Sequence, residues 1–204
     1  MANPRISKNY RSKSGDRTKA IADLRQTLEL KSDFADAQNT LGANLAQSGD
    51  GRRAETAFRA ALTVNPYDAE TRANLGRLLA GQGNWKQAAF HLQKAVQLDP
   101  AEANAHADYA TALVQMRRLP EAEKEAEAAV KADPKSPSAH DLLGEILAQK
   151  GQMALARVEF EAALKLAPGF GPAQVDLTEI LIQCGDVCAA TGIRQRTSRD
   201  VKRH

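Results

Sequence analysis

Residues 69–102, AETRANLGRLLAGQGNWKQAAFHLQKAVQLDPAE, hold two helix-like patterns separated by a turn. The leucines of 75–79 have the i, i+3, i+4 spacing of one helix face. A glycine and an asparagine at 83–84 predict a turn, and a second apolar stripe runs through 88–96. Asp99-Pro100 predicts the end of the second helix, because proline lacks an N–H group and disfavours helical geometry in the residue before it. The segment therefore predicts a pair of helices.

The same pattern returns every 34 residues, as prolines show at Pro66, Pro100, Pro134 and Pro168. Three further columns keep this step: Leu41-Gly42, Leu75-Gly76, Tyr109-Ala110 and Leu143-Gly144; Ala54, Ala88, Ala122 and Ala156; and Ala61, Ala95, Ala129 and Ala163. Neither helix of a pair can bury its apolar face alone, so neighbouring pairs must stack. The predicted fold class is all-α, a right-handed α-solenoid of stacked antiparallel helix pairs. In it, the glycines of the first column allow two helices to approach closely.

These columns resemble the tetratricopeptide repeat (TPR) family, whose 34-residue unit follows W-x2-L-G-x2-Y, then A-x3-F, then A and P. The first full unit matches this pattern with Leu41, Gly42, Leu45, Ala54, Phe58, Ala61 and Pro66. Polar residues replace the family's tryptophan throughout, at Gln38, Arg72, His106 and His140. The resemblance implies a TPR superhelix.

The repeat frame divides the chain into eight segments. They are a basic, disordered segment at 1–14, a half repeat (second helix) at 15–34, TPR units at 35–68, 69–102, 103–136 and 137–170, a half repeat (first helix and turn) at 171–190, and a basic, disordered tail at 191–204. Because neither end forms a polar capping unit, the sequence suggests a segment of a longer array. The final helix, with Leu177, Ile180, Leu181 and Ile182, is expected to expose an apolar patch and to self-associate.

Composition and charge narrow the class of protein. Only 4% of residues are aromatic, which argues against a β-sandwich or barrel. No apolar run is long enough for a transmembrane helix and no secretory signal is evident, so we expect a cytoplasmic protein. Residues 1–14 and 192–204 each carry +4 within a chain of net charge +3, so the body between them carries −5. We therefore expect solubilising tails rather than nucleic-acid binding, with tails that bind nucleic acid or an anionic membrane as the alternative.

Motifs of catalysis are missing from the sequence, which contains no phosphate-binding loop, zinc-protease motif or nucleophile elbow. Cys184 and Cys188 are four residues apart but flank a predicted turn, so ordinary reduced thiols are favoured over a metal site. His106 and His140 lie one repeat apart and could approach each other, yet half-buried packing residues are the simpler interpretation. We expect no enzyme activity, no metal and no cofactor.

The resemblance also implies where a partner binds, since family members typically use the concave surface formed by the first helices. Carried onto this sequence, that surface comprises Asp36, Asn39, Glu70, Asn74, Arg77, Asn104, Asp108, Thr111, Asp141, Glu145, Asp176 and Glu179. The alternative at each position is an exposed helix residue that plays no part in binding. Seven of the twelve are acidic and one, Arg77, is basic, so we expect a partner segment that contains lysine or arginine.

Two functions are compatible with these features. The first is a non-catalytic scaffold that holds a peptide segment of a partner protein in the groove. The alternative is a substrate-recruiting or assembly segment of a larger enzyme, because Asn74-Leu75-Gly76 is similar to repeats of O-linked glycosyltransferases. Chaperone-binding members hold a terminal carboxylate with a clamp of lysine, asparagine and arginine, and the predicted groove here lacks the lysine.

Overall fold

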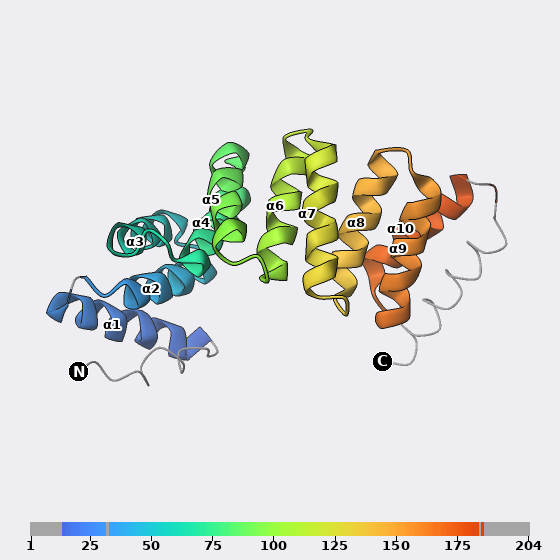
Figure 1. Cartoon of the computed structure of the whole chain (residues 1–204). Helices are drawn as coiled ribbons and strands as arrows, with labels where there is room; N and C mark the ends of the chain where they lie inside the picture. The colour runs from blue at the N-terminus through green and yellow to red at the C-terminus, as the bar shows by residue number, and fades with distance from the viewer. Residues whose placement is uncertain (1–13, 32, 184, 186–204) are drawn as a thin grey trace. The chain divides into compact units, whose positions relative to one another are not determined.

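The computed structural model describes residues 14–31, 33–183 and 185, which form ten α-helices and no strand (Figure 1). The helices are α1 (Ser14–Leu30), α2 (Ala35–Gln47), α3 (Gly51–Val64), α4 (Ala69–Gly81), α5 (Trp85–Leu98), α6 (Ala103–Gln115), α7 (Leu119–Ala132), α8 (Pro137–Gln149), α9 (Met153–Leu166) and α10 (Gly171–Gln183). Each predicted repeat is one helix pair, and α1 is the predicted second helix of the half repeat at 15–34. The all-α prediction is therefore confirmed.

The chain divides into two compact units, residues 1–99 and 100–204. In the first unit, α2 packs against α3 and α4 against α5, while α1 covers α2. In the second unit, α6 packs against α7 and α8 against α9, while α10 covers α9. The first helices of neighbouring repeats also contact each other, α2 with α4, α6 with α8, and α8 with α10. These contacts give each unit a surface built from first helices.

Glycines set the distance between the two helices of a repeat, as predicted. A Cβ atom added to Gly76 would lie 2.6 Å from Leu92 Cγ, and one added to Gly144 would lie 2.7 Å from Phe160 Cε1. Contacts this short would force the neighbour to move. The alanine column is equally tight, since Ala88, Ala122 and Ala156 are all fully buried.

The predicted apolar patch on the last helix is largely wrong. Leu177, Ile180 and Leu181 are only 3%, 4% and 2% exposed, because α10 packs against α8 and α9. Of the predicted patch only Ile182 is exposed, at 51%, and Val175, which was not part of that prediction, is 65% exposed. No helix in the described part of the chain is long and apolar enough to cross a membrane. The basic tails and the Cys184–Cys188 pair lie outside the described residues.

Candidate partner-binding site

In the first unit, side chains from α2 and α4 form a hydrogen-bonded row. The Asn74 amide donates to Asn39 Oδ1 at 3.1 Å, and Arg77 Nη1 donates to Asn74 Oδ1 at 3.4 Å. Asn39 is buried at the contact of the two helices, and Arg77 is exposed at the end of the row. Asp36 and Glu70 are exposed one turn earlier on the same helices. The structure thus brings together all five predicted residues of this unit on one pair of helices.

A pocket of about 440 Å³ opens beside this row. It is lined by Ala43, Ala46, Gln47, Gly49, Gly51, Phe58, Asn74, Arg77, Leu78, Gly81 and Gln82. The buried ring of Phe58 supplies an aromatic wall, and Asn74 with Arg77 supplies the polar one. Its size and mixed lining suit one or two amino-acid side chains.

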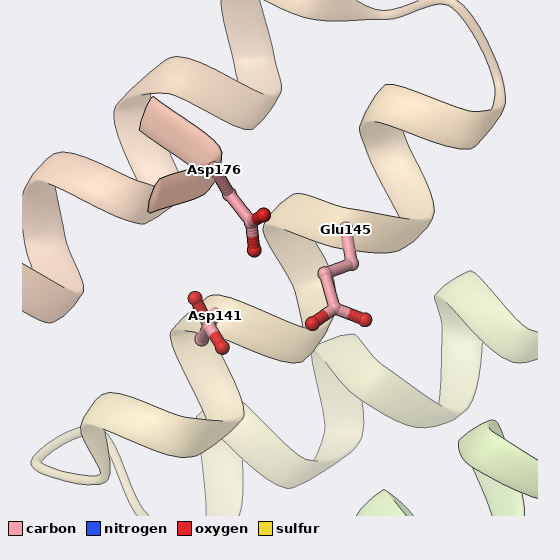
Figure 2. Close-up of side chains that lie close together, drawn as sticks. All are labelled: Asp141, Glu145 and Asp176. Atoms are coloured by element: carbon pink, nitrogen blue, oxygen red, sulfur yellow. The ribbon is translucent and has the colours of Figure 1, made fainter. Parts of the chain in front are cut away.

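In the second unit, three carboxylates converge from α8 and α10. Asp141 and Glu145 are one turn apart on α8, and Asp176 reaches toward them from α10 (Figure 2). Each residue offers one oxygen, and these oxygens lie within 4.8 Å of one another. Asp141 is only 6% exposed, and its Oδ1 atom is buried without a hydrogen-bond partner in the described structure. Negative charge is therefore concentrated at one point of the first-helix surface.

The pKa values of the three groups rise for the same physical reason. Burial, reinforced by Glu145 and Asp176, raises the pKa of Asp141 to about 7. Loss of hydration and the charge of Asp176 raise the pKa of Glu145, and burial together with Glu179 raises that of Asp176. The charges that raise these pKa values belong to neighbouring carboxylates. A positive charge placed here would relieve their repulsion, so the cluster is suited to hold a cation.

A second pocket, of about 350 Å³, opens beside the carboxylates. It is lined by Glu145, Ala148, Gln149, Met153, Phe160, Asp176, Glu179, Ile180 and Gln183. Every one of these nine residues follows a lining residue of the first pocket by 102 positions, or three repeats. The two units therefore carry the same pocket at equivalent positions.

The polar linings of the two pockets differ although their frames correspond. Phe58 and Phe160 are equivalent aromatic walls. The positions of Ala43, Asn74 and Arg77 in the first pocket hold Glu145, Asp176 and Glu179 in the second. Three of the seven predicted acidic residues thus line the pocket of the second unit, and none lines that of the first.

The remaining predicted residues, Asn104, Asp108 and Thr111, lie on α6 and line neither of these pockets. The Thr111 hydroxyl donates to the Ala107 carbonyl of its own helix at 2.9 Å, so part of its polar capacity is used locally. Asn104 is exposed and Asp108 is half-buried.

A structural role that the sequence did not reveal belongs to the position of the family's tryptophan. Arg72, His106, His140 and Gln174 each contact the carbonyl oxygen of the proline six residues earlier, at 2.9, 3.2, 3.3 and 2.7 Å. His106 and His140 also bond through Nδ1 to Glu125 and Glu159, both at 2.7 Å. These local partners account for the two histidines without a shared ligand. The constant distance of six residues from each proline, repeated every 34 residues, was the signal that could have indicated this role.

Comparison with known proteins agrees with the repeat architecture. Three family models, each described as tetratricopeptide repeat, match residues 39–103, 79–146 and 137–170. No curated protein matches the sequence.

Several solved structures share the fold. The crystal structure of PilW, a type IV pilus biogenesis factor, has a TM-score of 0.85 at 19% identity and covers 98% of this chain and 96% of that chain. PilF of Pseudomonas aeruginosa has a TM-score of 0.80 at 20% identity, covering 91% and 84%. YrrB, described as a TPR protein with an unusual peptide-binding site, has a TM-score of 0.72 at 18% identity, covering 85% and 90%. At these identities the similarity establishes the fold alone.

Proposed function

Because the chain belongs to the tetratricopeptide repeat family, we propose that it is a non-catalytic scaffold that binds a segment of a partner protein on its first helices. One observation carries this proposal, the pair of equivalent pockets on the first-helix surfaces of the two units. Each pocket combines an aromatic wall with polar groups at its rim, the combination by which protein surfaces fix the side chains of a peptide.

The partner segment is basic in this proposal, and the second unit attracts it most strongly. Glu145, Asp176 and Glu179 line the pocket there, whereas Arg77 lines the equivalent pocket of the first unit. Like charges on one surface reinforce a single negative potential, which attracts lysine and arginine. Salt should weaken the attraction, since at 0.1–0.15 M it screens exposed charges beyond about 8–10 Å. We also propose that the protein is located in the cytoplasm, and cell fractionation would test this.

The test begins with peptides selected from a random library for binding to the full chain. Their affinities are then compared with those of equal-length peptides in which glutamate replaces each basic residue, by fluorescence anisotropy at two salt concentrations. We expect the basic peptides to bind more tightly, and the difference to shrink at high salt. Equal binding of both sets would contradict the charge preference, and a failure to select any binder would contradict the scaffold function.

Charge-reversal variants of the protein test the same proposal with the peptide left unchanged. Glu145 and Glu179 are exposed, so Glu145→Lys with Glu179→Lys should leave the fold intact and weaken basic peptides by about tenfold or more. Asp141→Lys is unsuitable because it would bury a lysine. Glu127→Lys, on the exposed face of the second helix α7, is the matched control and should have little effect.

A further inference from the structure

We propose that the pocket of the second unit is a subsite for a single lysine side chain of the partner, with the ammonium group between Asp141, Glu145 and Asp176. The inference rests on the proposed function, because it assumes that a partner segment lies on the first helices. It goes further by naming the residue that the pocket recognises.

The carboxylate cluster calls for a cation that the described structure does not supply. Three carboxylate oxygens from two helices lie within 4.8 Å of one another, and the charges that raise their pKa values are acidic. Asp141 is more than nine-tenths buried and its Oδ1 has no hydrogen-bond partner, and its carboxylate lies close to those of Glu145 and Asp176 (Figure 2). A buried carboxylate without a partner is costly, and a charged donor from a ligand would remove that cost.

The geometry of the cluster suits an ammonium group. An ammonium has three N–H donors in a tetrahedral arrangement, and acceptors at ordinary hydrogen-bond distance from it lie about 4.7 Å apart. The three oxygens are no more than 4.8 Å apart, so one ammonium group placed between them is within hydrogen-bond reach of all three. The planar guanidinium of arginine presents its donors as a flat fork, which suits one carboxylate better than three that surround a point.

The pocket beside the cluster can take the aliphatic stem. Its volume is about 350 Å³, and Ala148, Phe160 and Ile180 give it apolar walls next to Glu145 and Asp176. Lysine commonly buries its four methylene groups against apolar surface while its charge remains at a polar rim. Cluster and pocket together thus match both parts of one side chain.

The first unit provides an internal comparison. Its pocket has the same frame, but uncharged residues, Asn39, Ala43 and Asn74, occupy the positions of the three acids in the cluster. No carboxylate is among the residues that line this pocket, so it offers no counter-charge to the ammonium group of lysine. The inference therefore predicts that a lysine side chain binds the pocket of the second unit more tightly than the similarly shaped pocket of the first.

The experiment uses the full chain, labelled for NMR, and three nine-residue alanine–serine peptides that differ only in the central residue. That residue is lysine, norleucine or glutamate. The lysine peptide should perturb the signals of Ala148 and Ile180 and bind about tenfold more tightly than norleucine, which has a similar stem but no charge. Signals of Leu78 in the first pocket should change less with lysine than those of Ile180.

Single neutralisations localise the effect. Asp176→Asn should weaken the lysine peptide by about threefold to tenfold and leave the norleucine peptide unchanged. Asp141→Asn should also weaken it, and circular dichroism of this buried variant checks that its helical content is kept. Glu127→Gln on α7 removes the same charge away from the pocket and should have no effect.

Several results would overturn the lysine subsite. These are equal binding of the lysine and norleucine peptides, no effect of Asp176→Asn, or saturable binding of calcium chloride at these signals without any response to lysine. If any of these results is found but the library-selected peptides still perturb the NMR signals of the pocket residues, the lysine subsite is wrong and the proposed scaffold function survives. If they too leave the pockets unperturbed, the proposed function fails as well.

Discussion

At the scale of single residues, the position of the family's tryptophan shows that different polar side chains can make the same hydrogen bond in successive repeats. Arginine, histidine and glutamine there all reach the carbonyl of the preceding repeat's final proline. Each residue therefore ties one repeat to the turn that precedes it. The hydrogen bond in this column requires a polar side chain with suitable reach, which three different side chains provide.

Glycine at the helix contact gives a prediction with a matched control. Gly144→Ala should destabilise the protein by about 1–3 kcal/mol, because the added methyl group would meet the buried ring of Phe160. Gly81→Ala adds the same methyl group at the end of α4, where nothing lies within 4 Å, and should be neutral or slightly stabilising. Urea unfolding measures both changes. Equal effects of the two substitutions would mean that the close approach of the helices is not what selects glycine.

His91 predicts a pH dependence of stability in the first unit. Burial, aided by Arg59 and Arg72 and partly offset by Glu55, lowers the pKa of His91 to about 4. Since the unfolded chain binds this proton near pH 6.5, the neutral ring contributes full stability above that pH. The contribution is lost as the pH falls from about 6.5 to about 4.

Titration of His91 should therefore lower the unfolding free energy of the wild type by about 1–3 kcal/mol between pH 7 and pH 4.5. The variant His91→Gln should not show this part of the decrease. The measurement is the difference in unfolding free energy between wild type and variant at the two pH values. Taking this difference removes the contributions of the other titrating groups, which both proteins share. A difference that does not change with pH would contradict the assignment to His91.

At the scale of elements, the repeat columns predicted the helix pairs because the 34-residue step fixes both the turn and the buried face. The third repeat shows the limit of that reasoning. Its turn uses Arg117 with a positive φ of 62°, where the other described repeats use glycine with φ between 76° and 82°. Backbone contacts determine this turn, since Arg118 N–H bonds to the Leu113 carbonyl at 2.9 Å. The sequence column alone does not contain that information.

The candidate site was predicted in part for a related reason. The positions carried over from the TPR family placed Asp141, Glu145 and Asp176 on the first helices. The resemblance did not reveal that their carboxylates meet, because the meeting depends on how α10 packs against α8. It also treated the acidic charge as uniform, whereas the two equivalent pockets have different linings.

The last helix carries the self-association prediction in a revised form. Leu181→Asp would place a charge in the core and report only on folding, since Leu181 is buried. Val175 and Ile182 are exposed two turns apart on α10, so Val175→Asp with Ile182→Asp should abolish concentration-dependent association and keep the helical content. Sedimentation velocity tests this. A wild-type chain that stays monomeric at high concentration would reject the prediction.

At the scale of the whole molecule, we predict that the basic tail competes with the partner segment for the acidic surface. Residues 192–204 carry +4 and are tethered to the chain, so they act at a high effective concentration. Deleting residues 192–204 should tighten the binding of a basic peptide by about threefold or more, with a larger gain at low salt. Anisotropy titrations of the full and shortened chains provide the measurement, and an unchanged affinity would exclude competition by the tail.

The central claim is that a partner segment binds on the first helices, at the two equivalent pockets. Hydrogen–deuterium exchange of the full chain, with and without a library-selected peptide, tests it most directly. We predict slower exchange in α2 and α4, which form the first pocket, and in α8 and α10, which form the second. Protection confined to the second helices α3, α5, α7 and α9, with the first helices unchanged, would contradict the account.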